Sequence, residues 1–563
     1  MKKWIIAEKK SDDVIEQILI NRKITAGEKQ LFLNPSYNID LHNPRLLSDA
    51  PEAAKRIIDA IEKKEKIGIF ADYDADGIPG GVLLYEFLNK IGATDVFWHV
   101  PERSDGYGLS NDTIDLFIQE NVNLIITVDA GITAKVEVAY AKKNNIEVII
   151  TDHHEIQKDK LPKDCLIINP KLSSKYPFKD LCGTGVVFKL CQLISEMVPD
   201  KINPDQMKWF LDLVAISTIC DIVPLLGENR VLTKFGLIVL RKTKRIGLKS
   251  LYKISAIDPE KIDPYVVGFQ IGPRINAGGR LKNSKAAFKL LIEKDEIIAD
   301  NLAQELNKIN IERQEVLSEA ILKAISKIEK QDLSKNKILM ISDETWPAGI
   351  VGLIAGKIVE KYGRPAIVLG KDEENLVGSA RSIDGFHLIE DLSEVADMMI
   401  RFGGHSKAAG LTFKESDFDN IYAKILKIAE EKLSNEDLVP SIHIDLVLKP
   451  IDVNIELTDQ LKFLEPYGLG NYKPIFAMEN VVISDAKTIS ENKHLVLKLA
   501  SKEGGILETF NSIGFNMGEL NFKSGEIIDV AFYLEQDEWA KKNGRMSVQL
   551  KLVDIKKSGE EIK

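Results

Sequence analysis

The sequence predicts an α/β protein in which helices join a parallel-sheet lobe to a second α/β lobe, followed by a C-terminal β-barrel. Between residues 66 and 151, short apolar runs alternate with helical patterns, which is the order of a parallel sheet covered by helices. Residues 284–330 keep helical spacing without Pro or Gly, which predicts one or two bridging helices. From residue 441 onward, short strands between turns are typical of a small closed barrel.

The individual elements follow from the same patterns. In the first lobe we expect strands at 66–70, 95–100, 123–128 and 147–151. Helices are expected there at 53–61, 80–88, 112–120, 132–144 and 209–220. In the second lobe we expect strands at 337–341 and 365–369 around a helix at 349–362. The barrel strands are expected at 481–483, 494–499, 527–532 and 546–552.

Composition limits the class of protein. A chain of 563 residues is too long for one hydrophobic core and should divide into roughly three or four domains. No apolar run approaches the ~20 residues of a membrane helix, and the first residues begin no signal peptide, so we expect a cytoplasmic protein without a membrane partner. The four cysteines include no C-x-x-C pair, which argues against a zinc ribbon. Because the net charge is −10, a nucleic acid would be held by local basic patches and metal ions.

An acidic turn follows the first predicted strand. Asp72, Asp74 and Asp76 stand at every second position directly after the apolar run 66–70. A chain that leaves a strand in extended form points alternate residues to one side, so these carboxylates should converge. Pro79 then suits the first turn of the following helix. The unit predicts a strand, a cation-binding turn and a helix; a solvated acidic turn is the alternative.

Two later strands end in residues of the same chemistry. Asp129 follows the strand at 123–128, and His153 and His154 follow the strand at 147–151. Ligands of open α/β sheets bind outside the carboxyl ends of the strands, so these side chains should meet the acidic turn at one edge. Asp221, after the apolar helix, could cap that helix or complete the cluster. The sequence therefore predicts a metal site at this edge.

The predicted ligand set suits Mn²⁺ or Mg²⁺. Carboxylates with one or two imidazoles and no thiolate match these ions, and Asp74 or Asp129 could bridge two of them. Two ions would activate water, neutralise charge on a phosphate and stabilise the leaving oxygen. His154 could donate to a phosphate oxygen or protonate the leaving group.

Two Gly-rich segments could contact phosphate. In GPRINAGGR we expect a rigid turn from which Arg274 and Arg280 offer bidentate donors. In RFGGHSKAAG, the backbone at Gly403 and Gly404 could approach an anion beside His405. For both segments the alternative is a purely structural turn.

The motifs DYDADG, VDAG, TDHH and CDIVPL, in that order, resemble the four motifs of the DHH phosphoesterase superfamily. From about residue 50 to its end, the chain is similar to the RecJ-type branch of single-strand-specific exonucleases. The resemblance implies a DHH metal domain, bridging helices, a DHH-associated domain and an OB-fold. The expected limits, with an N-terminal segment first, are 1–45, 46–255, 256–335, 336–440 and 441–563.

The resemblance also implies roles for individual residues. The metal ligands would be Asp72, Asp74, Asp129, His153 and Asp221. His154 would touch the scissile phosphate, with Asp129 and Asp76 as further catalytic residues; Asp76 would support the site rather than bind metal directly. A terminal 5′ phosphate would be held by Arg103, Ser379 and Arg381. Where the family usually has Trp-His-Pro-Gly, this chain has WPAG at 346–349, so no role is transferred to that position.

The implied function is 5′→3′ hydrolysis of single-stranded DNA to 5′-mononucleotides, in DNA repair and recombination. A single-strand-binding protein and a helicase are the implied partners. One alternative is a DHH-type oligoribonuclease or cyclic-dinucleotide phosphodiesterase, which would share the metal site but usually lacks the OB-fold. Another is a non-catalytic nucleic-acid-binding scaffold, although such relatives have lost metal ligands and here every ligand position is occupied.

Overall fold

A parallel sheet forms the centre of the first lobe. The structure, a computed structural model, describes residues 2–102, 106, 108–281, 283–503 and 506–559. The strand order is β3-β2-β4-β5-β6, and every pairing is parallel. The strands are β2 (Ile67–Ala71), β3 (Val96–His99), β4 (Leu124–Val128), β5 (Glu147–Thr151) and β6 (Leu166–Ile168). The four expected strands are confirmed, whereas β6 is too short to give a pattern that sequence analysis could detect.

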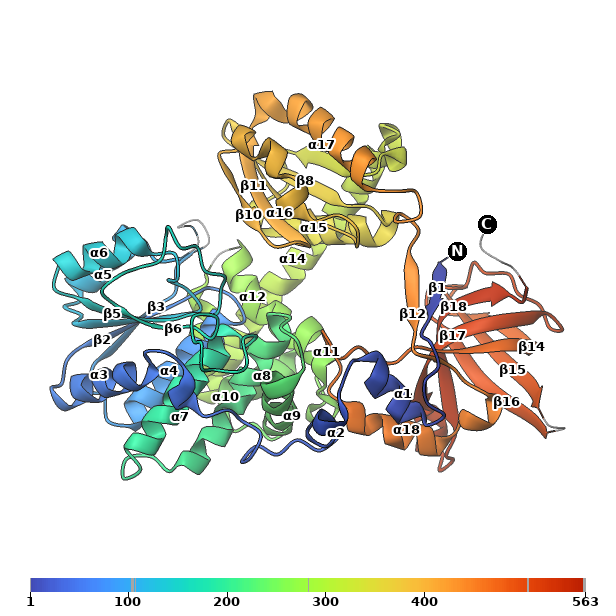
Figure 1. Ribbon diagram of the computed structural model, residues 1–563, viewed down its shortest axis with the longest axis horizontal. Coiled ribbons are helices and arrows are strands. Elements are labelled where there is room, and N and C mark those ends of the chain that lie inside the picture. The colour runs from blue at the N-terminus through green and yellow to red at the C-terminus, as the bar shows by residue number, and fades with distance from the viewer. Residues whose placement is uncertain (1, 103–105, 107, 282, 504–505, 560–563) are drawn as a thin grey trace.

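Helices cover both faces of this sheet, as Figure 1 shows. One face packs on α3 (Ala50–Glu62), α4 (Gly77–Lys90) and α7 (Gly183–Met197). The other packs on α5 (Asn111–Gln119) and α6 (Lys135–Lys143). Along β2, Ile69 points to the first core and Phe70 to the second. Both faces of the sheet are therefore shielded from water, which explains why its strands are continuous apolar runs in the sequence.

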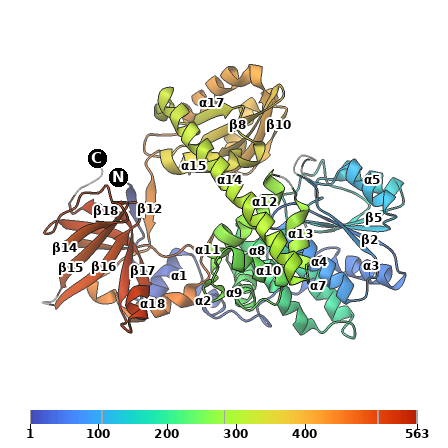
Figure 2. The same cartoon turned by 180° about the vertical axis from the view of Figure 1, so that it is seen from behind.

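A helical region extends the first lobe toward the second. Its helices are α8 (Leu211–Cys220), α9 (Gly227–Arg241), α10 (Ile246–Ile254), α11 (Pro264–Val266), α12 (Gly272–Leu281) and α13 (Lys285–Ile292). The long helix α14 (Glu296–Lys330) then runs from the first lobe to the second (Figure 2). The expected helical stretch is thus confirmed as α13 and α14, of which α14 bridges the two lobes.

The segment GPRINAGGR is a helix, α12, so the expected turn is wrong. Pro273 lies just after a π-helical stretch at Val267–Ile271, within a helical run that continues from Pro264 to Leu281. A Cβ at Gly279 would lie 2.7 Å from the carbonyl oxygen of Tyr73. The missing side chain therefore allows α12 to approach the acidic loop closely, and the glycine does not bend the chain.

The second lobe has a mixed sheet in the order β10-β11-β9-β8-β7. Its strands are β7 (Leu339–Asp343), β8 (Ala366–Asp372), β9 (Asn375–Arg381), β10 (Arg401–Gly404) and β11 (Ala408–Lys414). One face packs on α14 and α15 (Ala348–Tyr362), and the other on α16 (Leu388–Asp391) and α17 (Phe418–Lys432). The predicted elements at 337–341, 349–362 and 365–369 are confirmed within two or three residues at each end.

The C-terminal strands close into a barrel because β14 pairs with both β15 and β17. The barrel strands are β14 (Phe476–Ile489), β15 (His494–Glu503), β16 (Ile506–Gly514), β17 (Ile527–Gln536) and β18 (Val548–Lys557). Short β13 (Leu446–Val447) extends β14, and helices α18 (Ile455–Leu461) and α19 (Glu538–Lys542) accompany the barrel. The barrel and its four expected strands are confirmed; β16 was not predicted.

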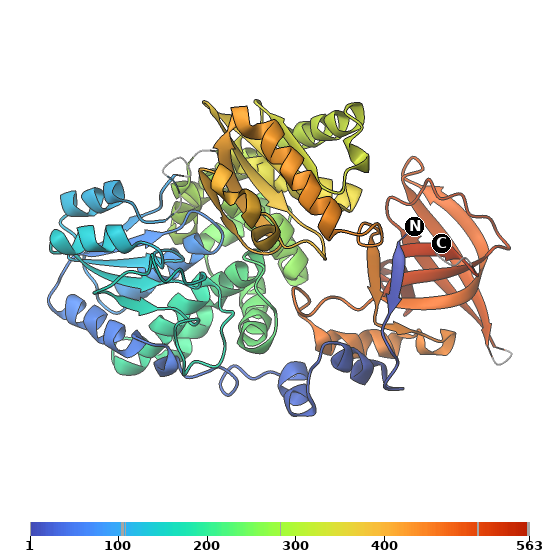
Figure 3. The same ribbon diagram turned by 45° about the horizontal axis from the view of Figure 1, so that its top comes forward.

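The N-terminal segment packs on the barrel, at the opposite end of the chain. Strand β1 (Lys3–Ile6) pairs in parallel with β12 (Ser441–Ile444), and Figure 3 shows β1 lying beside the barrel. Helices α1 (Val14–Asn21) and α2 (Ala26–Leu33) contribute apolar side chains to the barrel's core cluster. Among the described residues, no helix combines the length and apolarity that a membrane crossing needs.

One buried arginine joins the first lobe to the barrel linker. Arg230 of α9 is 1% exposed, and its guanidinium stacks 4.0 Å from the ring of Phe32. It donates hydrogen bonds to the carbonyl oxygens of Phe32, Phe463, Leu464, Glu465 and Pro466. Nearby, the N–H of Leu225 donates to the carbonyl of Leu469 (2.8 Å). These contacts tie the linker before the barrel to the loop that follows Asp221.

Candidate metal centre

Three neighbouring strands of the parallel sheet end in acidic residues. The last residues of β2, β4 and β5 are register partners. The next residues along the chain therefore leave the sheet side by side, and they are Asp72, Asp129 and Asp152. The N–H of Asp72 donates to Val128 (3.3 Å) and that of Asp129 to Thr151 (3.0 Å), so backbone bonds fix this alignment.

The side chains expected at this edge meet in space. Three groups each have one ligand atom per residue within 4.8 Å of the others: Asp72, Asp74 and Asp129; Asp129, His153 and His154; Asp76, His153 and Asp221. The groups share members and form one cluster. Nε2 of His153 lies 3.2 Å from Oδ1 of Asp129, 3.6 Å from Oδ2 of Asp221 and 3.7 Å from Oδ2 of Asp76.

The backbone around the cluster is unusual at two positions. Asp129 has φ = 59° and Ile222, next to Asp221, has φ = 56°, in the left-handed region that a β-branched residue rarely adopts. A Cβ at Gly183 would lie 2.6 Å from Cβ of Asp129, so only glycine fits at the start of α7. Such strain is typical of functional sites, where the surrounding structure compensates for it.

Asp74 and Asp76 hold the acidic loop in place through backbone N–H groups. Oδ1 of Asp74 accepts from the N–H groups of Asp76 (2.7 Å) and Gly77 (3.0 Å) at the start of α4. The two oxygens of Asp76 accept from Gly183 (2.6 Å) and Thr184 (2.8 Å) at the start of α7. Asp76 therefore ties the acidic loop to α7, and it also belongs to the group that it forms with His153 and Asp221.

Burial makes this concentration of negative charge unfavourable. It is the first cause that raises the pKa values of Asp72, Asp129 and Asp221 well above the usual carboxyl range, and neighbouring carboxylates raise them further. The pKa of Asp74 is raised in the same way, by burial and then by Asp76. A divalent cation would remove this penalty, because it would neutralise several carboxylates at once.

Asp152 is a buried residue beside the cluster whose contacts sequence reasoning missed. It is 1% exposed and accepts hydrogen bonds from the N–H of Ile132 (2.9 Å), from the N–H of His154 (3.0 Å) and from Nδ1 of His154 (2.8 Å). Burial lowers the pKa of His154, but the hydrogen bond to Asp152 and the surrounding carboxylates raise it to about 9. Its place as the first residue after β5, before the two histidines, was the signal that could have identified it.

The chemistry of the cluster fits Mn²⁺ or Mg²⁺. Its donors are carboxylate oxygens and imidazole nitrogens, which suit these ions better than a thiolate site would. Oδ1 of Asp72 is buried and has no hydrogen-bond partner among the described residues. A buried carboxylate oxygen without a donor is costly, and coordination to a cation would satisfy it.

Helix α12 supports the acidic loop. Oδ1 of Asn276 accepts from the N–H of Ala75 (2.7 Å), a contact that the sequence did not reveal. Nε of Arg274 donates a hydrogen bond to Oδ1 of Asn307 (2.9 Å), and Nη1 donates one to the carbonyl oxygen of Gln270 (2.6 Å). Two of the donors expected to meet phosphate are therefore engaged within the helices. The side chain of Arg280 lies outside the described residues.

In the second lobe, the expected residues lie side by side on the neighbouring strands β9, β10 and β11 or directly after them. Gly410 of β11 is the register partner of both Gly403 and Ser379. Arg381 donates to Oγ of Ser379 (2.7 Å), and the N–H of His405 donates to Ala408 (2.7 Å). The glycine pair ends β10 and the turn begins only at His405, so the expected Gly-Gly turn is displaced by two residues.

The charge of His405 acts on one residue of the first lobe, Glu155. Lys171 is the main cause that lowers the pKa of Glu155, the residue after His154, but the charge of His405 also contributes. Through His405, the second lobe therefore influences the charge of a residue next to the histidine pair. Arg103, expected on the same side, lies outside the described residues.

A parallel sheet that gathers carboxylates and paired histidines at its carboxyl edge, facing a second lobe, defines a metal-dependent phosphoesterase of the DHH class. Family comparisons agree with this class. Residues 66–218 match the DHH family, N-terminal domain; residues 335–432 match the DHHA1 domain; and residues 444–554 match the RecJ OB domain.

Known proteins identify the branch. The chain is 39% identical to the single-stranded-DNA-specific exonuclease RecJ of Bacillus subtilis, over 96% of this chain and 67% of that protein. It is 32% identical to the RecJ of Haemophilus influenzae, over 91% of each chain. The crystal structure of RecJ from Thermus thermophilus in complex with Mn²⁺ superposes with a TM-score of 0.84 at 27% identity, over 99% of this chain and 80% of that one. A structure of that protein in complex with Mg²⁺ also matches, with a TM-score of 0.77. The chain belongs to the RecJ family of single-stranded-DNA-specific exonucleases.

Proposed function

We propose that this chain is a 5′→3′ exonuclease that hydrolyses single-stranded DNA to 5′-mononucleotides, and that it acts in the cytoplasm in DNA repair and recombination. The observation that carries the proposal is the buried cluster of carboxylates and histidines at the ends of β2, β4 and β5. Relatives named as single-stranded-DNA-specific exonucleases match almost the whole chain, which supports the substrate class.

The residues of the cluster have separate tasks in this mechanism. Asp72, Asp74, Asp129, His153 and Asp221 would hold two Mn²⁺ or Mg²⁺ ions, and Asp76 would brace the loop against α7. When bound, the ions would supply Lewis acidity, which activates water and neutralises charge on the phosphate. The hydrogen bond between Asp152 and Nδ1 of His154 orients the imidazole, so Nε2 is the ring atom that would donate to a phosphate oxygen.

The second lobe would select the end of the strand. We assign the 5′ phosphate to Ser379 and Arg381 together with His405, Arg103, Gly404 and the open backbone at Gly403. Nothing in the described part of the structure lies within 4 Å of a Cβ built at Gly403, so an anion could approach that backbone directly. Arg274 and Arg280 would contribute positive charge near the path of the strand. The barrel would bind the strand farther from its 5′ end, and a single-strand-binding protein and a helicase would supply it.

The first test is Asp129→Asn in purified protein with Mn²⁺ and 5′-labelled single strands. Asn accepts the left-handed backbone of this position, so the variant should fold but lose hydrolysis. Asp159→Ala, an exposed carboxylate of the same lobe, is the matched control and should cleave at the wild-type rate. Wild-type activity in Asp129→Asn would refute the site assignment.

A second experiment tests the substrate. Wild-type protein is incubated with 5′- and 3′-labelled single strands, duplex DNA, dinucleotides and a cyclic dinucleotide. Release of labelled mononucleotide from 5′-labelled single strands at the start of the reaction is the expected result. Faster cleavage of dinucleotides or cyclic dinucleotides than of long strands would instead indicate the phosphodiesterase alternative, and binding without hydrolysis would indicate a scaffold.

A further inference from the structure

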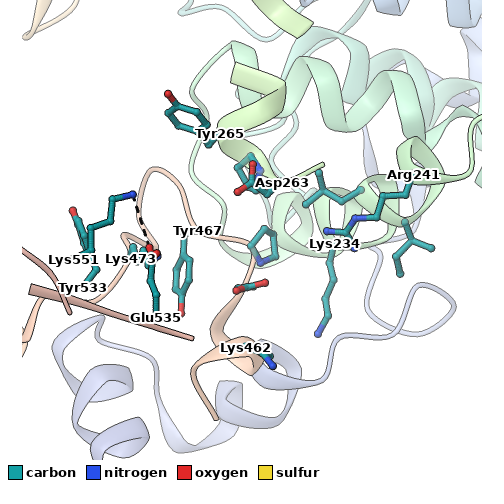
Figure 4. Close-up of a pocket in the computed structure, with 15 residues that line it drawn as sticks. Lys234, Arg241, Asp263, Tyr265, Lys462, Tyr467, Lys473, Tyr533, Glu535 and Lys551 are labelled. Atoms are coloured by element: carbon teal, nitrogen blue, oxygen red, sulfur yellow. Dashed lines mark hydrogen bonds and ion pairs between the residues drawn. The ribbon is translucent and has the colours of Figure 1, made fainter. Parts of the chain in front are cut away.

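A cavity of about 620 Å³ lies in the seam between the first lobe and the barrel (Figure 4). One wall comes from α9 and from the turn that leads into α11, and the other from the barrel linker with β17 and β18. This volume is typical of ligand sites. The cavity is separate from the metal cluster, since no described residue of the cluster lines it.

The lining has the chemistry of a single-strand site. Five cationic side chains face three carboxylates, although the chain as a whole carries a net charge of −10: Lys234, Arg241, Lys462, Lys473 and Lys551 against Asp263, Glu465 and Glu535. The phenol rings of Tyr265, Tyr467 and Tyr533 also line it. Lys473 lies 5.4 Å from the ring centroid of Tyr533. Cations interleaved with aromatic faces bind nucleic-acid strands without requiring a particular sequence.

An exposed aromatic pair extends this site toward the metal cluster. Tyr265 of α11 is 62% exposed, and Phe269 of the adjoining π-helical turn η5 (Val267–Ile271) is 67% exposed. Their rings stack at 4.8 Å between centroids and 26° between planes. Large aromatic side chains that pack on each other in solvent bury little surface, so folding does not explain them. π-Helical turns are frequent at functional sites.

The turn that carries the pair packs against the end of the helix that presents Asp221. A Cβ at Gly268 would lie 3.7 Å from Ile219, and one at Gly272 would lie 2.3 Å from Sγ of Cys220. Asp221 is the next residue after Cys220. The helical segment that carries the aromatic pair therefore joins the cavity, which Tyr265 lines, to the helix end that contributes to the metal cluster. Figures 1 and 2 both show α11 on the side of the first lobe that faces the barrel.

We propose that Tyr265 and Phe269 form a base-stacking subsite for the single strand where it passes from the barrel to the metal centre. The cations of the cavity would neutralise the phosphates of the nucleotides that lie over the barrel side. The inference rests on the proposed function, and it assigns to the first lobe a part of the strand contact that the barrel alone would otherwise provide.

The test uses single strands of thymidine nucleotides that carry one 2-aminopurine at successive positions, bound with Ca²⁺ in place of Mn²⁺. Stacking on the pair should quench 2-aminopurine at one or two internal positions in the wild type. The double variant Tyr265→Ala and Phe269→Ala should lose this quenching and bind a 20-nucleotide strand about 5- to 150-fold more weakly for each stacked base. Tyr265→Trp with Phe269→Trp should restore both readouts, because the flat faces return.

Trp209→Ala is the matched control. Trp209 is 46% exposed beside Lys244 and lies away from the cavity, so its loss should change neither affinity nor quenching. Unchanged affinity and quenching in the double variant, with a wild type that binds and degrades the strand, would overturn this inference alone. A wild type that neither binds nor degrades single strands would overturn the proposed function as well.

Discussion

The carboxyl edge of the parallel sheet and the seam beside the barrel are built in opposite ways. At the edge, backbone register between β2, β4 and β5 places the acidic residues together, and their side chains are buried or half-buried. At the seam, residues more than 200 positions apart meet through side chains, and the cavity remains open with exposed aromatic rings. The difference teaches that backbone register within one sheet sets the chemical site, whereas the strand contacts depend on side chains from segments far apart in the chain.

The largest expected effect is at the edge. Asp129→Asn should reduce hydrolysis by about 10³-fold or more, since one ligand of the cluster is lost. Without metal the same variant should be more stable than the wild type, by roughly 0.5–2 kcal/mol, because it removes a buried carboxylate whose pKa is raised by burial and like charges. Chemical denaturation in EDTA measures the change; a less stable variant would contradict this account of the charge.

At the seam, Arg230→Met should lower the free energy of unfolding by about 3 kcal/mol. The substitution keeps the volume but leaves the carbonyls of the linker without their donor in a buried site. Urea denaturation and limited proteolysis of the linker measure the loss. Lys249→Met, at an exposed position of α10, is the control and should be neutral. An equally neutral Arg230→Met would show that the seam does not depend on this residue.

Metal that binds at the edge should raise the free energy of unfolding, by more as the metal concentration exceeds its dissociation constant. Addition of Mn²⁺ at 100 times its dissociation constant should raise the free energy of unfolding by about 2.7 kcal/mol. Thermal unfolding with and without Mn²⁺ measures this shift. The shift should shrink in Asp129→Asn but persist in Arg230→Met, because only the first variant alters the cluster. Equal shifts in both variants would place the metal elsewhere.

The smallest effect is expected at Asp152. Asp152→Asn keeps the size of the side chain but weakens its hold on His154, so kcat should fall about 10- to 100-fold. The variant should hardly change the affinity for the strand. His154→Gln alone should also lower kcat, and the double variant Asp152→Asn with His154→Gln should have the same kcat as His154→Gln alone. Additive losses in the double variant would show that Asp152 acts independently of His154.

Much of the candidate site could be predicted because it depends on local pattern. Apart from Asp221, which follows helix α8, the acidic and imidazole residues lie within a few positions of the end of an apolar strand, and parallel strands bring such positions to one edge. Asp152 was missed because its role is a hydrogen bond to a neighbour rather than a place in the cluster. Asn276 was missed because nothing in its local pattern shows that α12 would pack on the acidic loop.

The sequence by itself determined the alternation of strands and helices, the two α/β lobes with the barrel, and which strand ends carry metal-binding chemistry. These features follow from the periodicity of apolar residues and from short motifs. Only the tertiary structure decided that GPRINAGGR is a helix, that the first residues pack on the barrel, and that Arg230 joins the lobe to the linker. The physical reason is that these contacts link segments far apart in the chain, and their energy depends on surfaces that exist only after folding.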